Sequence, residues 1–153
     1  MKTASLHFIQ GQYAKSYYFA GKALQLNSKN SEAALYAAIS AAKMGKQEEA
    51  RQLFELAIEA RPQIPEALFN YALFLKKQKE FDKAMTMYQR HEQNFGPSLD
   101  VRLAIAGLCE IQGKASEACT KYEEISNSGL RMDKQTKRVV QKKIRTLCNQ
   151  GED

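Results

Sequence analysis

Residues 31–60 read SEAALYAAISAAKMGKQEEARQLFELAIEA, and the helical architecture can be inferred from this stretch. Its first half is a helix-length run with alanine at helical spacing, which Gly45-Lys46 interrupts. Its second half carries one apolar stripe at the i, i+4, i+7 and i+8 positions of a helix: Ala50, Phe54, Ala57 and Ile58. The stretch therefore predicts two helices joined by a short turn.

The same arrangement recurs along the chain with a period of 34 residues. One register position holds only alanine: Ala4, Ala38, Ala72 and Ala106. A second holds small residues: Ser16, Ala50, Ala84 and Ala118. A turn position holds Gly11, Gly45, Lys79 and Gly113, and a mostly aromatic position holds Ala20, Phe54, Tyr88 and Tyr122. Small residues let antiparallel helices approach closely, and each helix pair must stack on its neighbours to bury its apolar face.

These positions resemble the tetratricopeptide repeat (TPR) family, whose unit is also 34 residues long. The second unit resembles it most fully, through Ala38, Gly45, Ala50, Phe54, Ala57 and Pro62. The third departs at His91 and Glu92 and the fourth at Ile125 and Ser126, where small and aliphatic residues would be expected. The resemblance implies an all-α, right-handed α-solenoid of about four hairpins plus a C-terminal capping helix. We expect the TPR array over residues 1–130, with repeats at about 1–30, 31–64, 65–98 and 99–130.

Residues 131–153 are predicted to form a basic amphipathic capping helix and a short tail. Its apolar face holds Met132, Thr136, Val140, Ile144, Leu147 and Cys148. Its basic residues include Lys134, Lys137, Arg138, Lys142, Lys143 and Arg145. Together with Arg131 and Asp133 they give residues 131–145 a net charge of +6, the whole excess of the chain. The helix is either a solubilising cap or a site for an anionic protein, lipid or nucleic acid.

The first helix pair departs from the family pattern, because the large residue that usually precedes Ala4 would fall ahead of Met1. Either the chain is a trimmed piece of a longer array or the first pair is short. We expect Leu6, Phe8 and Ile9 to be exposed there, and the hypothesis of self-association through this end follows.

Motifs for catalysis or cofactor binding are missing from the sequence. His7 and His91 are too far apart for a metal pair, and Gly113-Lys114 lacks the spacing and hydroxyl of a phosphate loop. Cys109, Cys119 and Cys148 are odd in number and lack metal-ligand spacing, so neither a disulfide framework nor a zinc site is expected. We expect Cys109 and Cys119 to be free thiols, and we expect no enzymatic activity, no metal and no cofactor.

The resemblance implies a concave groove lined by the first helix of each pair. Carried onto this chain, its inward positions are Leu35, Tyr36, Ile39, Lys43, Phe69, Asn70, Leu73, Lys76, Lys77, Leu103 and Gly107. Tyr36 and Phe69 suit apolar anchor sites, and Gly107 lets a partner backbone approach. The alternative is that some of these apolar residues pack between repeats. Asn70 alone matches the family's clamp for a C-terminal carboxylate, so that clamp is not expected.

The sequence thus favours a noncatalytic adaptor or scaffold that binds a peptide or helix of another protein in the groove. Two alternatives are a small secretion-type chaperone for an apolar client segment and an anion-binding module acting through the basic helix. Nucleic acid and acidic membranes are not the expected partners, and no small-molecule substrate is expected. Without a signal peptide or an apolar run long enough to cross a membrane, we expect a cytoplasmic location.

Overall fold

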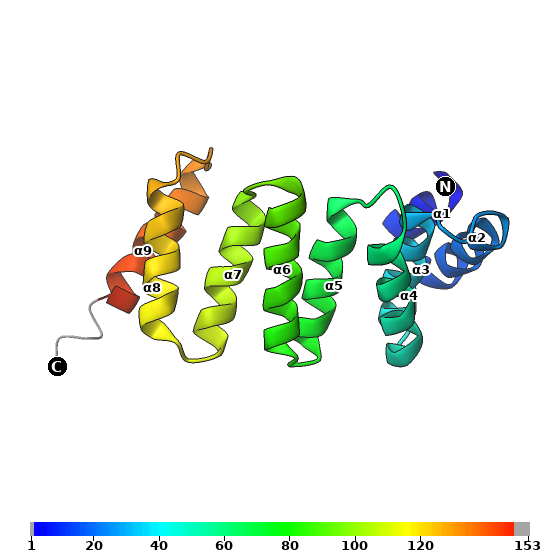
Figure 1. Cartoon of the computed structure of the whole chain (residues 1–153), viewed down its shortest axis with the longest axis horizontal. Helices are drawn as coiled ribbons and strands as arrows, with labels where there is room; N and C mark the ends of the chain where they lie inside the picture. The colour runs from blue at the N-terminus through cyan, green and yellow to red at the C-terminus, as the bar shows by residue number, and fades with distance from the viewer. Residues whose placement is uncertain (1, 149–153) are drawn as a thin grey trace. The chain divides into compact units, whose positions relative to one another are not determined.

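The computed structural model describes residues 2–148, and every regular element among them is an α-helix (Figure 1). Nine helices follow one another along this part of the chain: α1 (Lys2–Ile9), α2 (Tyr13–Leu26), α3 (Ser31–Lys43), α4 (Gln47–Glu59), α5 (Pro65–Lys77), α6 (Phe81–Phe95), α7 (Leu99–Ile111), α8 (Ala115–Asn127) and α9 (Lys134–Cys148). Among the described residues, no helix has both the length and the apolar composition that a bilayer crossing requires.

The repeated positions of the sequence coincide with buried positions of the structure. All four alanines of the first register are buried: Ala4, Ala38, Ala72 and Ala106. The second small position is fully buried in every repeat: Ser16, Ala50, Ala84 and Ala118. The aromatic position is buried as well, at Phe54, Tyr88 and Tyr122. The prediction of closely packed helix hairpins is therefore confirmed.

The turns within the four hairpins share one backbone geometry. The residue at the turn position has a positive φ in each: Gly11 (71°), Gly45 (82°), Lys79 (61°) and Gly113 (73°). The amide of the next residue donates to the carbonyl five positions earlier, as from Lys46 to Ala41 (3.0 Å) and from Glu80 to Leu75 (2.9 Å). This is the Schellman ending of a helix, which favours glycine because a side chain is strained at positive φ.

The chain folds as two compact units, unit 1 (Met1–Phe74) and unit 2 (Leu75–Asp153), and the boundary lies within α5. In unit 1, α1 packs on α2 and α3, while α3 also packs on α2 and α4. Phe54 of α4 meets α5, with ring-centroid distances of 5.4 Å to Tyr71 and 5.2 Å to Phe74. Asn30 caps α3 by accepting a hydrogen bond from the Ala33 amide at 2.9 Å.

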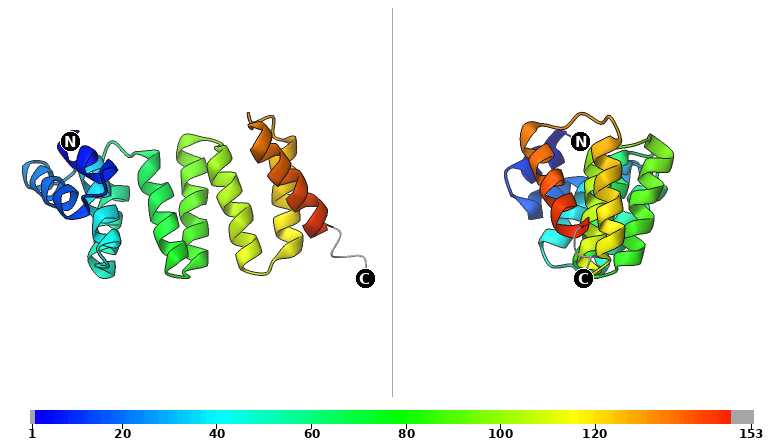
Figure 2. Two further views of the ribbon diagram at one scale, coloured as in Figure 1. Left: turned by 180° about the vertical axis from the view of Figure 1, so that it is seen from behind. Right: turned by 90° about the vertical axis from the view of Figure 1, so that its left-hand side faces the viewer.

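In unit 2, α7 packs on α6 and α8, and α9 lies across α8 (Figure 2). The core that α9 completes contains Ala106, Tyr122, Ile125 and Val140. Asp133 accepts a hydrogen bond from the Thr136 amide at 2.7 Å, so it caps the start of α9. The predicted amphipathic helix thus covers the last hairpin.

Two of the three cysteines are bonded to each other, which the sequence did not predict. Cys119 of α8 and Cys148 of α9 form a disulfide with their Cα atoms 5.3 Å apart, so the expectation of no disulfide, with Cys119 a free thiol, is wrong. α8 and α9 run antiparallel, which brings the beginning of α8 to the end of α9 (Figure 1). Cys109 is a buried free thiol, as expected.

Candidate protein-binding surface

The groove positions predicted on α3 divide into one core residue and three surface residues. Leu35 is only 5% exposed, so it packs between helices and is not part of the candidate surface. Tyr36 and Ile39 are half-buried, and Lys43 is exposed. Position 35 corresponds to 69 and 103 in the next two repeats, where the side chains remain half-buried. Burial at this position therefore differs between repeats even though the register does not.

The N-terminal hairpin reaches this face of α3. The Phe8 ring of α1 lies 5.6 Å from the Tyr36 ring, and the Lys43 ammonium lies 5.9 Å from the Tyr13 ring of α2. Phe8 is half-buried by these aromatic neighbours, so the expectation that it is exposed is wrong. Leu6 and Ile9 are exposed as expected, by 53% and 80%.

The predicted positions on α5 lie at the surface. Phe69, Asn70 and Leu73 are half-buried, and the Asn70 side-chain amide donates to the Glu66 carbonyl of its own helix at 2.8 Å. In the last turn of α5, Lys76 is half-buried and Lys77 is exposed. These residues leave partly accessible apolar carbon beside polar groups.

Acidic and basic residues are sorted between the two ends of these helices. Glu32 and Glu66 lie in the first turns of α3 and α5, while Lys43, Lys76 and Lys77 lie in their last turns. The helix dipole favours this distribution, with negative charge at the N-terminus and positive charge at the C-terminus. Local helix stability therefore accounts for the charge sorting without any partner.

The fourth hairpin presents its predicted positions differently, because α9 covers part of α7. Leu103 and Leu99 pack against the core cluster that contains Val140 of α9. Gly107 is open, since a Cβ placed there would meet nothing within 4 Å. In the sequence, the apolar face of α9 predicts that this helix packs on a neighbouring helix. The sequence does not say which residues of α7 lie beneath it.

A hydrogen-bonded triad joins α7, α8 and α9. Glu110 accepts a hydrogen bond from the Tyr122 hydroxyl at 2.5 Å and another from the Lys143 ammonium. Burial pushes the pKa of Glu110 upward, but these two donors outweigh burial and hold the pKa below its usual range. Burial and the Glu110 carboxylate both raise the pKa of Tyr122.

The predicted basic residues of α9 therefore fall into two groups. Lys143 is half-buried and engaged with Glu110. The other five are exposed and form no ion pair within the described part of the chain: Lys134, Lys137, Arg138, Lys142 and Arg145. They make a positively charged stripe along the outer face of α9, which we call the basic stripe.

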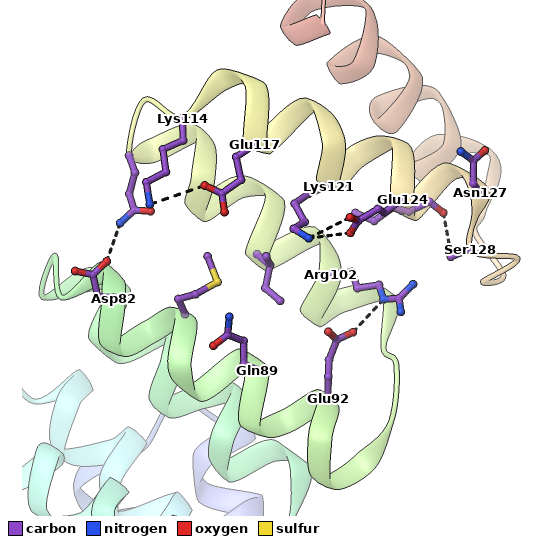
Figure 3. A pocket seen from close by; sticks show the side chains of 14 residues that line it. Asp82, Gln89, Glu92, Arg102, Lys114, Glu117, Lys121, Glu124, Asn127 and Ser128 are labelled. Atoms are coloured by element: carbon purple, nitrogen blue, oxygen red, sulfur yellow. Dashed lines mark hydrogen bonds and ion pairs between the residues drawn. The ribbon is translucent and has the colours of Figure 1, made fainter.

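A pocket between α6, α7 and α8 was not expected from the sequence (Figure 3). Its volume is about 620 Å³, and Met85, Ile105 and Ile125 contribute its apolar lining. Six of the charged lining residues form ion pairs: Arg102 with Glu92 at 3.0 Å, Lys121 with Glu124 at 2.9 Å and Lys114 with Glu117 at 3.9 Å. The seventh, Asp82, accepts a hydrogen bond from the Gln112 side-chain amide at 3.2 Å. Glu92 and Ile125 are positions where the repeats depart from the family pattern, and these departures are the signal that could have located the pocket.

One group of potential metal ligands occurs among residues 2–148. Donor atoms of Cys119, Glu123 and Cys148 lie within 4.8 Å of one another. Both sulfurs are bonded to each other, so they are not the thiolates that a soft metal ion requires. The group in this state fits a metal ion poorly.

Comparison with known proteins agrees with the fold. Residues 32–63 and 66–95 match the sequence profile of the tetratricopeptide repeat. No match was found among curated proteins. Among solved structures, MamA from AMB-1 is 18% identical with a TM-score of 0.74, and the match covers 97% of this chain and 85% of that one.

Two further structures are similar over less than two thirds of their own length. PilF from Pseudomonas aeruginosa is 15% identical with a TM-score of 0.79, and the match covers 97% of this chain and 65% of PilF. YrrB, described as "a TPR protein with an unusual peptide-binding site", is 20% identical with a TM-score of 0.67, and the match covers 82% of this chain and 65% of YrrB. The repeat register, the shared hairpin geometry and the two matched segments show that the chain contains tetratricopeptide repeats and has an all-α solenoid fold.

Proposed function

We propose that the chain is a noncatalytic protein-binding module that holds a peptide or helix of another protein on the first helices of its hairpins. The observation that carries this proposal is the partial exposure of large apolar residues at equivalent positions of unit 1. Ile39 and Leu73 are one repeat apart and half-buried, and Tyr36 and Phe69 lie close to them in sequence. Lys76, Lys77, Leu103 and Gly107 remain predicted contacts for a longer partner.

Aromatic and branched side chains suit this role because they gain much contact area and lose little conformational freedom on binding. A partner that covers a half-exposed leucine or isoleucine removes further apolar surface from water. Complete burial of such a side chain is worth about 1.5–3 kcal/mol, so completing the burial of two of them is a substantial part of micromolar affinity.

Peptides selected from a random display library against the wild-type protein provide the probe for a test. The double variant Ile39→Asp with Leu73→Asp should bind them at least about tenfold more weakly, because it places two charges in an apolar contact. The control is Leu56→Asp, which changes a 39% exposed leucine on the second helix of a hairpin. Circular dichroism checks that all variants are folded. Equal loss of binding in the control, or full binding by the double variant, contradicts the proposal.

A second candidate function is the binding of an acidic protein segment by the basic stripe. The apolar face of α9 is packed against the core of unit 2, so the helix does not offer that face to a bilayer. It contains no aromatic residue on which bases could stack. Carboxylates of a protein partner then match the five exposed cations best.

This second candidate can be tested with two variants of identical net charge. Replacing Lys137, Arg138 and Lys142 of the basic stripe by Glu should abolish binding to polyglutamate. Replacing Lys15, Lys22 and Lys29 of unit 1 by Glu should leave most of the binding. Both triple variants reduce the net charge from +6 to zero. Equal loss in the two variants shows that only net charge matters, and tighter binding to duplex DNA or phosphatidylserine vesicles favours those partners instead.

Self-association through α1 is a third hypothesis, motivated by the exposure of Leu6 and Ile9. Sedimentation equilibrium should then show a dimer that Ile9→Asp dissociates. A monomer at all concentrations contradicts the hypothesis.

A further inference from the structure

The disulfide lies where α9 ends, and it spans 29 residues of sequence. Cys119 and Cys148 are both half-buried, so a small reductant reaches the sulfur atoms. Cys109, in contrast, is completely buried on α7. The three cysteines therefore differ in access as well as in bonding.

Few other contacts fix the C-terminal end of α9. Val140 is the buried residue of this helix, whereas Ile144 and Leu147 are only partly buried where they pack on the core of unit 2. Lys143 adds a single ion pair with Glu110. The disulfide limits the conformations open to α9 when this helix detaches from α8. Breaking the disulfide therefore makes the detached state more populated.

We propose that Cys119–Cys148 is a reducible latch that sets how firmly α9 covers α7 and α8. In the oxidised protein, α9 stays on the core cluster of unit 2, against which Leu99 and Leu103 of α7 also pack. After reduction, the end of α9 leaves this position more often and uncovers these two leucines. The latch is a property of unit 2 and does not depend on the proposed binding surface.

A dithiol is the class of reductant that the latch requires. One thiolate of the dithiol attacks a sulfur of the disulfide and forms a mixed disulfide, and the second thiolate then releases the protein. The S–S bond of the protein is broken, two electrons and two protons are added to give two thiols, and the dithiol becomes a cyclic disulfide.

Glu123 adjusts the rate of this exchange. Its carboxylate oxygen lies 3.9 Å from the Cys148 sulfur. The attacking and leaving species are both anionic thiolates, and a neighbouring carboxylate repels them. Glu123→Gln should therefore be reduced faster than wild type at the same dithiol concentration.

Thiol counting by mass spectrometry tests the bond itself. After equilibration with oxidised glutathione, alkylation in denaturant should add one label, on Cys109, and alkylation after dithiothreitol should add three. Three labels without dithiothreitol would overturn the proposal.

Hydrogen exchange tests whether the bond acts as a latch. Amides of α9 should lose at least tenfold of their protection after reduction, whereas amides of α6 should not change. Cys148→Ser should reproduce the reduced pattern, and Cys109→Ala should keep the contrast between oxidised and reduced protein. Reduction of the wild-type protein gives the same comparison if a variant does not fold. Equal protection of α9 in both redox states overturns the latch.

Discussion

The α3–α4 hairpin and the α8–α9 pair are held together by different means. In the first, alanines allow the two helices to pack closely, and they are completely buried or nearly so: Ala33, Ala34, Ala37, Ala38, Ala41, Ala50 and Ala57. In the α8–α9 pair, Val140 is the buried residue that α9 contributes. A disulfide and the Lys143–Glu110 ion pair also hold α9 in place.

This difference follows from the position of each pair in a repeat array. An internal hairpin has neighbours on both sides, so shape complementarity can be satisfied across most of its surface. A capping helix keeps one face in water and has less apolar area to bury. The capping helix therefore depends on an ion pair and a disulfide, whereas the α3–α4 hairpin depends on close packing.

The largest effect should come from a core substitution in the first region. Phe54→Ala should lower the free energy of unfolding by about 3–5 kcal/mol, because it leaves a cavity between α4 and the Tyr71 and Phe74 rings. Val140→Ala in α9 should cost about 2 kcal/mol, since less volume is lost. Urea unfolding followed by circular dichroism measures both, and hydrogen exchange assigns each loss to unit 1 or unit 2. A larger loss for Val140→Ala would contradict the comparison.

The next effect concerns the shared turn geometry. Lys79 has a φ of 61° where the equivalent residues are glycines. Lys79→Gly should raise the free energy of unfolding of unit 2 by about 1 kcal/mol, and Gly45→Ala should lower that of unit 1 by about as much. Thermal unfolding of the two variants measures these opposite shifts. Shifts of the same sign would show that turn conformation does not govern the difference.

A similar gain is expected at a buried hydroxyl in α2. Ser16 is completely buried, its oxygen has no hydrogen-bond partner, and the equivalent residues in the other repeats are alanines. Ser16→Ala should therefore stabilise unit 1 by up to about 1 kcal/mol, because the desolvated hydroxyl is removed. The surface substitution Ser28→Ala is the control for chemical denaturation. A loss of stability in Ser16→Ala would mean that the hydroxyl has a partner.

The smallest effect should be the pH dependence of the α9 contact. The pKa of Glu110 is lowered in the folded protein, so its contribution to stability is present above the ordinary pKa of a glutamate, about 4.3, and is lost as the pH falls through the folded value. Unfolding midpoints of unit 2 measured from pH 6 to pH 3 should fall less steeply for Glu110→Gln than for wild type. Identical profiles would exclude a role for this carboxylate.

Much of the fold was predictable because it depends on local and periodic features. Pro65 begins α5, and the first helix of each pair ends two residues before the expected turn residue. The three buried register positions follow from the helical period and the size of the side chains. The departures at Glu92 and Ile125 were also visible in the sequence, although their joint effect on the pocket lining was not.

Several properties of the candidate surface were not predictable. Leu35 and Leu103 occupy equivalent positions, yet one is in the core and the other lies against the cluster that α9 completes. Cys119 and Cys148 are brought together only when α9 docks antiparallel to α8. The binding surface itself, the chaperone alternative and the absence of a carboxylate clamp remain predictions.

The sequence alone determined the all-α class, the 34-residue period and the positions that must be small or aromatic, because each depends on neighbours within one helix turn or one repeat. Tertiary structure alone decided which predicted surface residues stay accessible, which cysteines meet and where α9 lies over α7. The reason is physical: accessibility and cross-linking depend on distances between helices, and those distances follow from how all the side chains of an interface pack together.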